Sequence, residues 1–228
     1  MRILKGKQNV ISMSGYKYET QLLATRQVEA YWEGLRMGRL VPQRSEIDPR
    51  GIERALEYTF LLERISPGLA RFRLAGMHLN DLLGMEVRGM PFTSFFTPTA
   101  RQQVADTLED VFDGPMVAEL ALAAERRMGK PAMDGRVILL PLRSDLGEVS
   151  RILGCLETIG PIGRAPRRFD VSDVAFKTLK AGHLPETVKD TILVSGFADK
   201  PVPFSLAKEK RPDEKHPALR LVVSNDSD

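Results

Sequence analysis

Cysteine and histidine are scarce in this chain, whose 228 residues contain one cysteine and three histidines. The single Cys155 cannot form a disulfide within the chain, and low cysteine usage is typical of a protein from a reducing compartment. Metal sites built from nitrogen and sulfur ligands need several such residues at short spacing, and His78, His183 and His216 lie too far apart in sequence to provide one. The composition therefore argues against a disulfide framework and against a metal centre.

Long apolar runs and a strong charge imbalance are also absent. No segment approaches the roughly 18 consecutive apolar residues of a membrane-spanning helix, and the first residues lack the apolar centre of a secretory signal. The formal net charge is only +3, from 33 basic and 30 acidic residues, which is no footprint of a polyanion-binding protein. We expect a cytoplasmic protein without membrane insertion, and the charge argues against nucleic acid as its partner.

Catalytic motifs are missing as well. The sequence contains no glycine-rich phosphate loop before a helix, no serine elbow and no cysteine–histidine set. Adjacent carboxylates occur at 109–110 and 213–214, on the exposed face of an expected helix and in an expected tail, where acidic side chains are normally solvated. We therefore expect that the chain is not an enzyme.

Helical periodicity begins near residue 19, after a leader over residues 1–18 that has no clear period. Four apolar residues recur near one face of a helix that ends at Gly38. They are Leu23, Ala30, Tyr31 and Leu35. Because an apolar stripe of this kind needs a cover, we interpret it as a candidate face for a partner protein or for a homodimer.

A change of periodicity marks the start of the folded domain near residue 50, after an N-terminal helix and linker over 19–49. Asp48 followed by Pro49 predicts the start of a short helix. Residues 58–74 then alternate like a β-hairpin around a Pro-Gly turn. Glycine and proline interrupt residues 80–96, which favours short helical turns there.

The most regular helix is predicted from Thr97-Pro98, with threonine as the cap, to the stop at 114–115. Three strands are expected after it, at 117–124, 137–142 and about 151–159. Because only turn signals separate them, they predict an antiparallel arrangement. The expected fold is α+β, a five-stranded antiparallel sheet with its helices on one face.

Beyond residue 160 the composition changes, with seven prolines and no sustained period. We interpret residues 161–228 as a largely disordered tail, with a short helix at about 172–180 as its one regular element. The domain proper is then expected over residues 50–160.

Five sequence runs, in order and at compatible spacing, resemble a known family. They are LRMGRLVPQRSEIDP after Trp32, ARFRLAGMHLNDLLGMEVRGMPF, RVILLPLRSDLG, RILGCLE and PRRF. The predicted order of strands and helices is that of a PAS domain, and these runs resemble small stand-alone bacterial PAS proteins of the alphaproteobacterial type. The resemblance covers about residues 30–170.

The resemblance implies a regulatory or sensory role without catalysis. Since these 228 residues contain no kinase, cyclase or DNA-binding module, the output is expected to pass to separate signalling proteins, such as histidine kinases. Flavin-binding relatives carry an asparagine–cysteine–arginine motif on a short helix, whereas Cys155 falls in the last expected strand. Haem-binding relatives use a histidine on the long helix, and residues 98–113 contain none. Haem and flavin are therefore not expected.

Side chains around the glycine-rich segment are candidates to line a small-molecule pocket. These candidates are His78, Met85, Arg88, Phe92, Phe95 and Phe96. Apolar clefts with a few convergent polar groups are the usual small-molecule sites, and an arginine fork suits a carboxylate or phosphate. The alternative is that the phenylalanines are core residues, that His78 is structural and that Arg88 satisfies backbone groups in its turn.

Two further features admit both a functional and a structural interpretation. Cys155 is either an exposed redox thiol or, as its apolar strand favours, a buried inert one. Arg164, Arg167 and Arg168 either contact nucleic acid or belong to a solvated linker or a protein contact. The first interpretation of these arginines, with the basic residues of the tail, gives the alternative function of a nucleic-acid-associated regulator.

Overall fold

The computed structural model describes residues 22–114 and 116–182. The expected leader over 1–18 and the expected tail beyond residue 182 lie outside the described residues. In chain order the elements are α2 (Leu23–Arg36), η1 (Arg44–Glu46), η2 (Pro49–Tyr58), β1 (Thr59–Ser66), β2 (Leu69–Ala75), α3 (Met77–Leu83), η3 (Phe92–Phe95), α4 (Arg101–Asp113), β3 (Met116–Ala124), β4 (Asp134–Arg143), β5 (Val149–Ile159) and β6 (Phe169–Thr178), where η marks a 3-10 helix.

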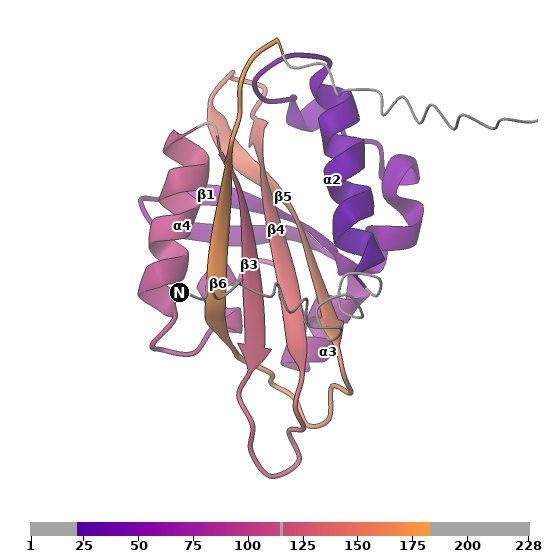
Figure 1. Cartoon of the computed structure of the whole chain (residues 1–228), viewed down its shortest axis with the longest axis vertical. Helices are drawn as coiled ribbons and strands as arrows, with labels where there is room; N and C mark the ends of the chain where they lie inside the picture. Colours follow the sequence, from indigo (N-terminus) through magenta and orange to yellow (C-terminus); the bar gives the residue numbers. More distant parts are fainter. Residues whose placement is uncertain (1–21, 115, 183–228) are drawn as a thin grey trace, which may run out of the picture. The chain divides into compact units, whose positions relative to one another are not determined.

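The strands form one antiparallel sheet in the order β2-β1-β5-β4-β3-β6 (Figure 1). The predicted α+β class, the antiparallel pairing and the first five strands are confirmed. The prediction of only five strands is wrong, because β6 adds a sixth at the β3 edge. The sheet therefore continues past the expected domain end at residue 160.

A bulge explains why β6 was mistaken for a short helix at 172–180. Asp173 pairs with Ala121 and Val171 pairs with Leu122, so Ser172 is the extra residue between them. The extra residue puts Val171 and Val174 three positions apart, a helical spacing, although both pack against the core. Without the bulge, Val171 and Val174 would point to opposite faces of the sheet; with it, both side chains point to the core.

The start of α4 also differs from the prediction. The helix begins at Arg101, and its N-cap Ala100 has no side-chain cap. The hydroxyl of Thr97, expected as the cap, instead donates to the carboxylate of Asp170, and the Thr97 N–H donates to the carbonyl of Phe169 at 3.0 Å. The competing partner is β6, which the sequence did not reveal.

Helices cover both faces of the sheet, whereas they were predicted on one face only. Figure 1 shows α4 and α2 on opposite sides of the strands. α3, η3 and α4 pack on the first face, and α2 and η2 pack on the second. The reason lies in β4 and β5, whose central residues are buried in unbroken runs, as expected for strands with both faces covered.

Candidate ligand site

The first face of the sheet is filled by phenylalanine. Phe92, Phe95 and Phe96, predicted as pocket candidates, pack with Phe60 and Phe72, and their ring centroids lie 5.2–5.9 Å apart. All five side chains are buried. The rings stack or meet edge to face, the arrangements that aromatic pairs prefer. The structure therefore places these residues in a packed core.

The other pocket candidates on this side do not converge. His78 lies on α3, where its Nε2 is 2.9 Å from the Thr158 hydroxyl and its ring meets the edge of Tyr58 at 4.9 Å. Burial lowers the pKa of His78. Met85 and Arg88 are exposed in the turns after α3. The six predicted residues thus do not form a single site.

An apolar cavity of about 270 Å³ lies on the second face, under η2. Its base is a row of register partners across three strands, Leu74 of β2, Leu61 of β1 and Leu153 of β5. The side chains that close it from η2 and the segment before it include Ile47, Ile52 and Leu56. Sequence analysis missed this cavity because its walls come from four segments that no local pattern connects.

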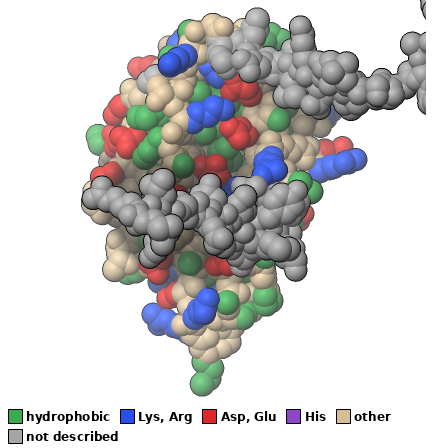
Figure 2. Space-filling view, viewed as in Figure 1, with side chains coloured by type: hydrophobic (Ala, Val, Ile, Leu, Met, Phe, Trp, Pro, Cys, Tyr) green, Lys and Arg blue, Asp and Glu red, His purple; other side chains and the backbone are tan. Residues whose placement is uncertain are grey.

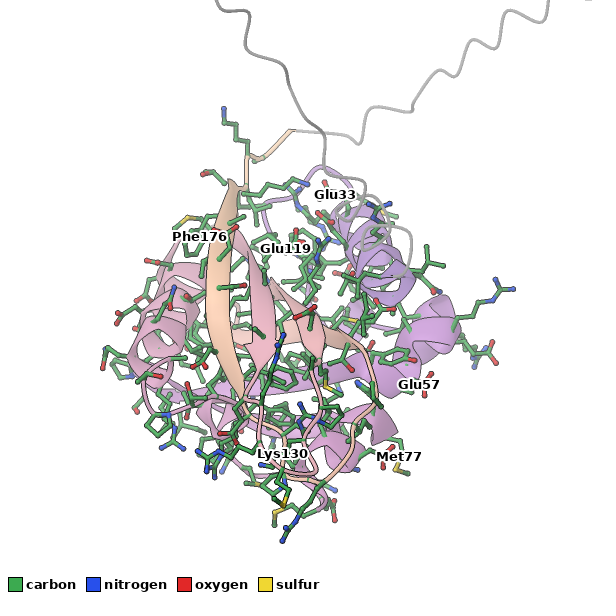
Figure 3. The ribbon with its side chains drawn as sticks, turned by 60° about the horizontal axis from the view of Figure 1, so that its bottom comes forward. Glu33, Glu57, Met77, Glu119, Lys130 and Phe176 are labelled. Carbon is green, nitrogen blue, oxygen red and sulfur yellow. The ribbon has the colours of Figure 1, made fainter. Side chains whose placement is uncertain are left out.

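Close approach of two chain segments fixes the position of η2. A Cβ on Gly76, between β2 and α3, would lie 2.1 Å from the carbonyl oxygen of Glu57 at the end of η2. Figure 3 shows Glu57 and Met77 at this junction, on the same side of the molecule. Glycine is needed here for space alone, since its φ of −70° suits any residue.

A second hollow of about 330 Å³ adjoins the apolar cavity and is lined mainly by polar groups. The two share Arg44, Leu61 and Leu74. We call it the arginine cleft, and its lining comprises Arg44, Leu61, Arg73, Leu74, Arg88, Ser144, Asp145 and Arg151. Of the sequence candidates, Arg88 is the one that lies at this site.

Only part of the positive charge in the arginine cleft is balanced. The carboxylate of Glu63 lies 3.3 Å from Arg73 and 2.8 Å from Arg151, and it also pairs with Arg71. Burial alone would raise the pKa of Glu63, but the arginines lower it overall, so it stays ionised. Neither Arg44 nor Arg88 forms an ion pair with any residue that the structure describes.

Helix α2 turns a different face to the sheet from the one that the sequence analysis singled out. Its buried residues are Ala24, Thr25, Val28, Trp32 and Arg36. The Trp32 indole donates to the Pro141 carbonyl at 3.0 Å. Leu23 is 65% exposed and Ala30 is exposed, while Leu35 is half-buried.

Tyr31, the remaining member of the predicted stripe, joins α2 to η2. Its hydroxyl accepts from the Asp48 N–H at 2.7 Å and lies 3.1 Å from the Asp48 carbonyl oxygen, to which it donates. Its ring packs on Gly51, where a Cβ would lie 2.2 Å from it. The element that closes the apolar cavity is thus bound directly to α2.

Glu157 of β5 caps the N-terminal end of α2. Its Oε2 accepts from the N–H groups of Ala24 at 3.0 Å and Thr25 at 3.2 Å, which are unpaired donors of the first helical turn. Burial raises the pKa of Glu157, against the opposing effect of these backbone bonds. The cap therefore comes from the sheet rather than from the helix's own sequence.

We expect Glu157→Ala to lower the free energy of unfolding by about 1 kcal/mol, the usual cost of losing a helix cap. Glu157→Gln keeps an oxygen acceptor without a buried charge, and we expect it to be nearly neutral at pH 7. Because the folded protein holds the Glu157 proton more tightly, this residue contributes stability below its ordinary pKa of 4.5, which is lost as the pH rises through the raised folded value.

Urea unfolding of the wild type and of Glu157→Gln at pH 4.5 and pH 7 measures this contribution. The wild type should gain stability relative to Glu157→Gln on acidification, because the other titrating groups are common to both proteins. An unchanged difference between the two proteins at the two pH values would contradict the role assigned to Glu157.

Cys155 is free and fully buried, and it lies on the α2 face of the sheet. Burial raises the pKa of its thiol, which keeps it protonated at neutral pH. We expect Ellman's reagent to leave Cys155 unmodified in the native protein and to react fully after unfolding in guanidinium. Rapid stoichiometric labelling of the native protein would instead show an accessible thiolate.

Among the described residues, no group of three or more histidine, cysteine, aspartate or glutamate side chains is placed to hold a metal ion. Within the same residues, no helix has the length and apolar character needed to cross a membrane.

Solved structures that resemble this chain include a blue-light photoreceptor domain and a PAS domain. The light state of the blue-light photoreceptor Aureochrome1 LOV is 12% identical, with 49% of this chain and 88% of that chain covered and a TM-score of 0.34. The PAS domain of an HTR-like protein from Haloarcula marismortui is 18% identical, with 64% and 99% covered and a TM-score of 0.33. Similarities of this size carry no argument about function.

The family comparison is more direct. No curated protein matches the chain. A family model described as a PAS domain matches residues 20–157, which include α2, η2, the lining of the apolar cavity, the first four strands and all but the last two residues of β5. The match spans more than half of the sequence, so this chain belongs to the PAS domain family.

Proposed function

We propose that this chain is a non-catalytic, cytoplasmic regulatory protein of a bacterial PAS type. It binds a small molecule and passes the signal by contact with a separate signalling protein, such as a histidine kinase. The PAS family is a family of sensory domains, which supports the sensory part. The observation that carries the proposal is the apolar cavity under η2, because apolar concave sites are the usual places for small-molecule binding.

The position of the cavity supports a route from ligand to partner. Ile52 and Leu56 of η2 face the cavity, and Asp48 beside η2 is bound to Tyr31 of α2. A ligand that prefers one position of η2 would shift the population of α2 positions by its difference in affinity for the two states. α2 presents Leu23 and Ala30 to solvent, and these residues are the proposed partner or dimer face.

Native mass spectrometry of the purified full-length protein tests the sensory part of the proposal. We expect a co-purifying small molecule at a defined stoichiometry, released when the protein unfolds. A ligand-free mass from every preparation, together with no thermal shift from a broad metabolite panel, would contradict small-molecule sensing. The same spectrum reads whether the protein is a monomer or a dimer.

The partner face has its own test. Purified histidine kinases from the source organism are assayed for autophosphorylation with and without the protein. We expect one of them to respond, and Leu23→Asp to abolish the response while Met128→Asp, at the 98% exposed tip of the β3–β4 connection, leaves it unchanged. Equal effects of both variants, or no response from any kinase, would remove support for α2 as the output face.

Nucleic acid is not favoured as the partner. The surface that Figure 2 shows has acidic and basic side chains intermixed. Beside the arginine cleft, Glu63 pairs with Arg73 and Arg151, and Asp145 adds a further carboxylate to the lining of the cleft. Non-specific nucleic-acid binding needs a continuous basic surface, so the described residues give this alternative no support.

A further inference from the structure

We propose that the apolar cavity and the arginine cleft form one site for an amphiphilic anion, a medium-length alkyl chain that carries a carboxylate or phosphate head. This inference rests on the proposed function and names the ligand class. It places the ligand on the α2 side of the sheet, away from the phenylalanine core.

The apolar half of the site suits a hydrocarbon chain. Apart from Arg44, at the edge that the cavity shares with the cleft, Thr59 is the only residue of its lining with a polar side chain. Thr59 is itself engaged, since its hydroxyl donates to the Ala55 carbonyl at 2.8 Å. A cavity without free polar partners gives no compensation for burying a polar ligand group, and it favours methylene groups.

The polar half of the site suits an anion. Four arginines line the cleft against one aspartate, and Glu63 balances two of the four from the side. Arg44 and Arg88 have no ion-pair partner among the described residues, so their planar forks are available for bidentate binding of a carboxylate or phosphate. Asp145 opposes the anion, and we expect it to limit the affinity for highly charged heads.

The apolar cavity and the arginine cleft meet, so one ligand can place its hydrocarbon chain in the first and its anionic head in the second. Arg44, Leu61 and Leu74 line the cavity and the cleft at once, so a chain lying over Leu61 and Leu74 brings its head to Arg44. An inorganic anion would leave the apolar cavity empty, and a neutral lipid would leave the arginines without a counterion. Leu74, on a strand yet 54% exposed, is the apolar residue at this junction that water reaches.

Isothermal titration of the full-length, delipidated protein tests the ligand class. The probes are laurate and dodecyl phosphate, below their critical micelle concentrations. Dodecyltrimethylammonium supplies the same chain with the opposite charge, and acetate and inorganic phosphate supply the heads alone. We expect laurate or dodecyl phosphate to bind at one site, at least about tenfold more tightly than any of the three controls. Whichever probe binds more tightly identifies the head group.

Variants separate the two halves of the site. The double variant Arg44→Gln/Arg88→Gln should weaken binding of the preferred probe by about tenfold or more, since it removes the charge-assisted hydrogen bonds to the head group. Leu74→Trp should weaken it by filling the junction. The controls are Arg126→Gln and Met128→Trp, both exposed on the β3–β4 connection, and they should bind as the wild type does.

Equal affinity for laurate and dodecyltrimethylammonium, or wild-type affinity in the double arginine variant, would overturn the anionic part of the inference. If neither anionic amphiphile binds while native mass spectrometry finds another co-purifying molecule, the inference falls and the proposed sensory function stands. If laurate binds but hydrogen exchange of α2 and η2 is unchanged, the ligand class stands and the proposed route to the partner falls.

Discussion

Replacing Arg167 by alanine is expected to lower the free energy of unfolding by about 3 kcal/mol, because it removes buried hydrogen bonds and leaves a cavity. Arg167 lies in the connection between β5 and β6 and is fully buried. For a folded unit of this size, the loss corresponds to a fall in Tm of about 6–12 °C.

The contacts of Arg167 explain the size of this effect. Its Nη2 donates to the Pro131 carbonyl at 2.7 Å and its Nη1 donates to the Ile162 carbonyl, and alanine loses both bonds. The backbone N–H of Arg167 donates to the Leu82 carbonyl at 2.7 Å, and this bond is kept in the variant. The side chain thus ties the β3–β4 connection to the connection between β5 and β6. Burial lowers the pKa of Arg167, and its Nε is buried with no hydrogen-bond partner among the described residues. The hydrogen bonds to the Pro131 and Ile162 carbonyls offset part of the cost of burying the guanidinium charge.

Urea unfolding of three variants measures the contribution. Arg168→Ala is the matched control, because the neighbouring side chain is exposed, and it should stay within about 0.5 kcal/mol of the wild type. Arg167→Met keeps most of the volume without the donors, so we expect a loss between those of the other two variants. A loss below about 0.5 kcal/mol in Arg167→Ala would show that the connection to β6 is held by other contacts.

Gly76→Ala is expected to lower the free energy of unfolding by about 2–3 kcal/mol, since its Cβ would lie 2.1 Å from the backbone oxygen of Glu57. Neither segment yields easily, because the Gly76 N–H also donates to the Thr59 carbonyl at 2.8 Å. Relief of the overlap requires η2 to move away from β2. The same variant should therefore also change binding in the apolar cavity, which these two elements enclose.

Gly34→Ala is the control for this substitution. A Cβ at Gly34, in the last turn of α2, meets nothing within 4 Å, so the variant should be as stable as the wild type or gain up to about 1 kcal/mol from its better helix propensity. Chemical denaturation of both variants gives the comparison. Wild-type stability in Gly76→Ala would mean that η2 is loosely placed and that the cavity beneath it is not a fixed feature.

Local sequence signals predicted the elements that depend on them. Asp48 and Pro49 open η2 as expected, and the Asp48 carboxylate accepts from the Arg50 N–H at 3.0 Å. The hairpin of β1 and β2 and the strands β3, β4 and β5 follow from alternation and turn residues. The predictions that failed concern elements whose structure depends on a segment far away in the sequence. Asp170 binds Thr97 away from its expected role as a cap, and the bulge at Ser172 hides the periodicity of β6.

The candidate site was predictable only in part, for the same reason. Arg88 could be singled out because a charged residue in a glycine-bounded turn stands out in a sequence. The sequence alone could not assign the candidate phenylalanines to a pocket or to the core. Phe92 packs on Phe60, and Phe60 lies over Gly154 of a distant strand, where a Cβ would lie 2.2 Å from its ring. The row of Leu74, Leu61 and Leu153 depends on strand register, which single-strand patterns do not contain.

The most direct test of the account is a methyl NMR titration of the full-length protein with laurate, because it locates the ligand. We predict that the methyl signals of Ile47, Ile52 and Leu153 shift on saturation, since these residues line the cavity under η2. Signals from Leu79 and Val104, which pack in the phenylalanine core, should stay in place. Shifts confined to the core residues, or no shifts at any laurate concentration, would contradict a ligand site on the α2 side of the sheet.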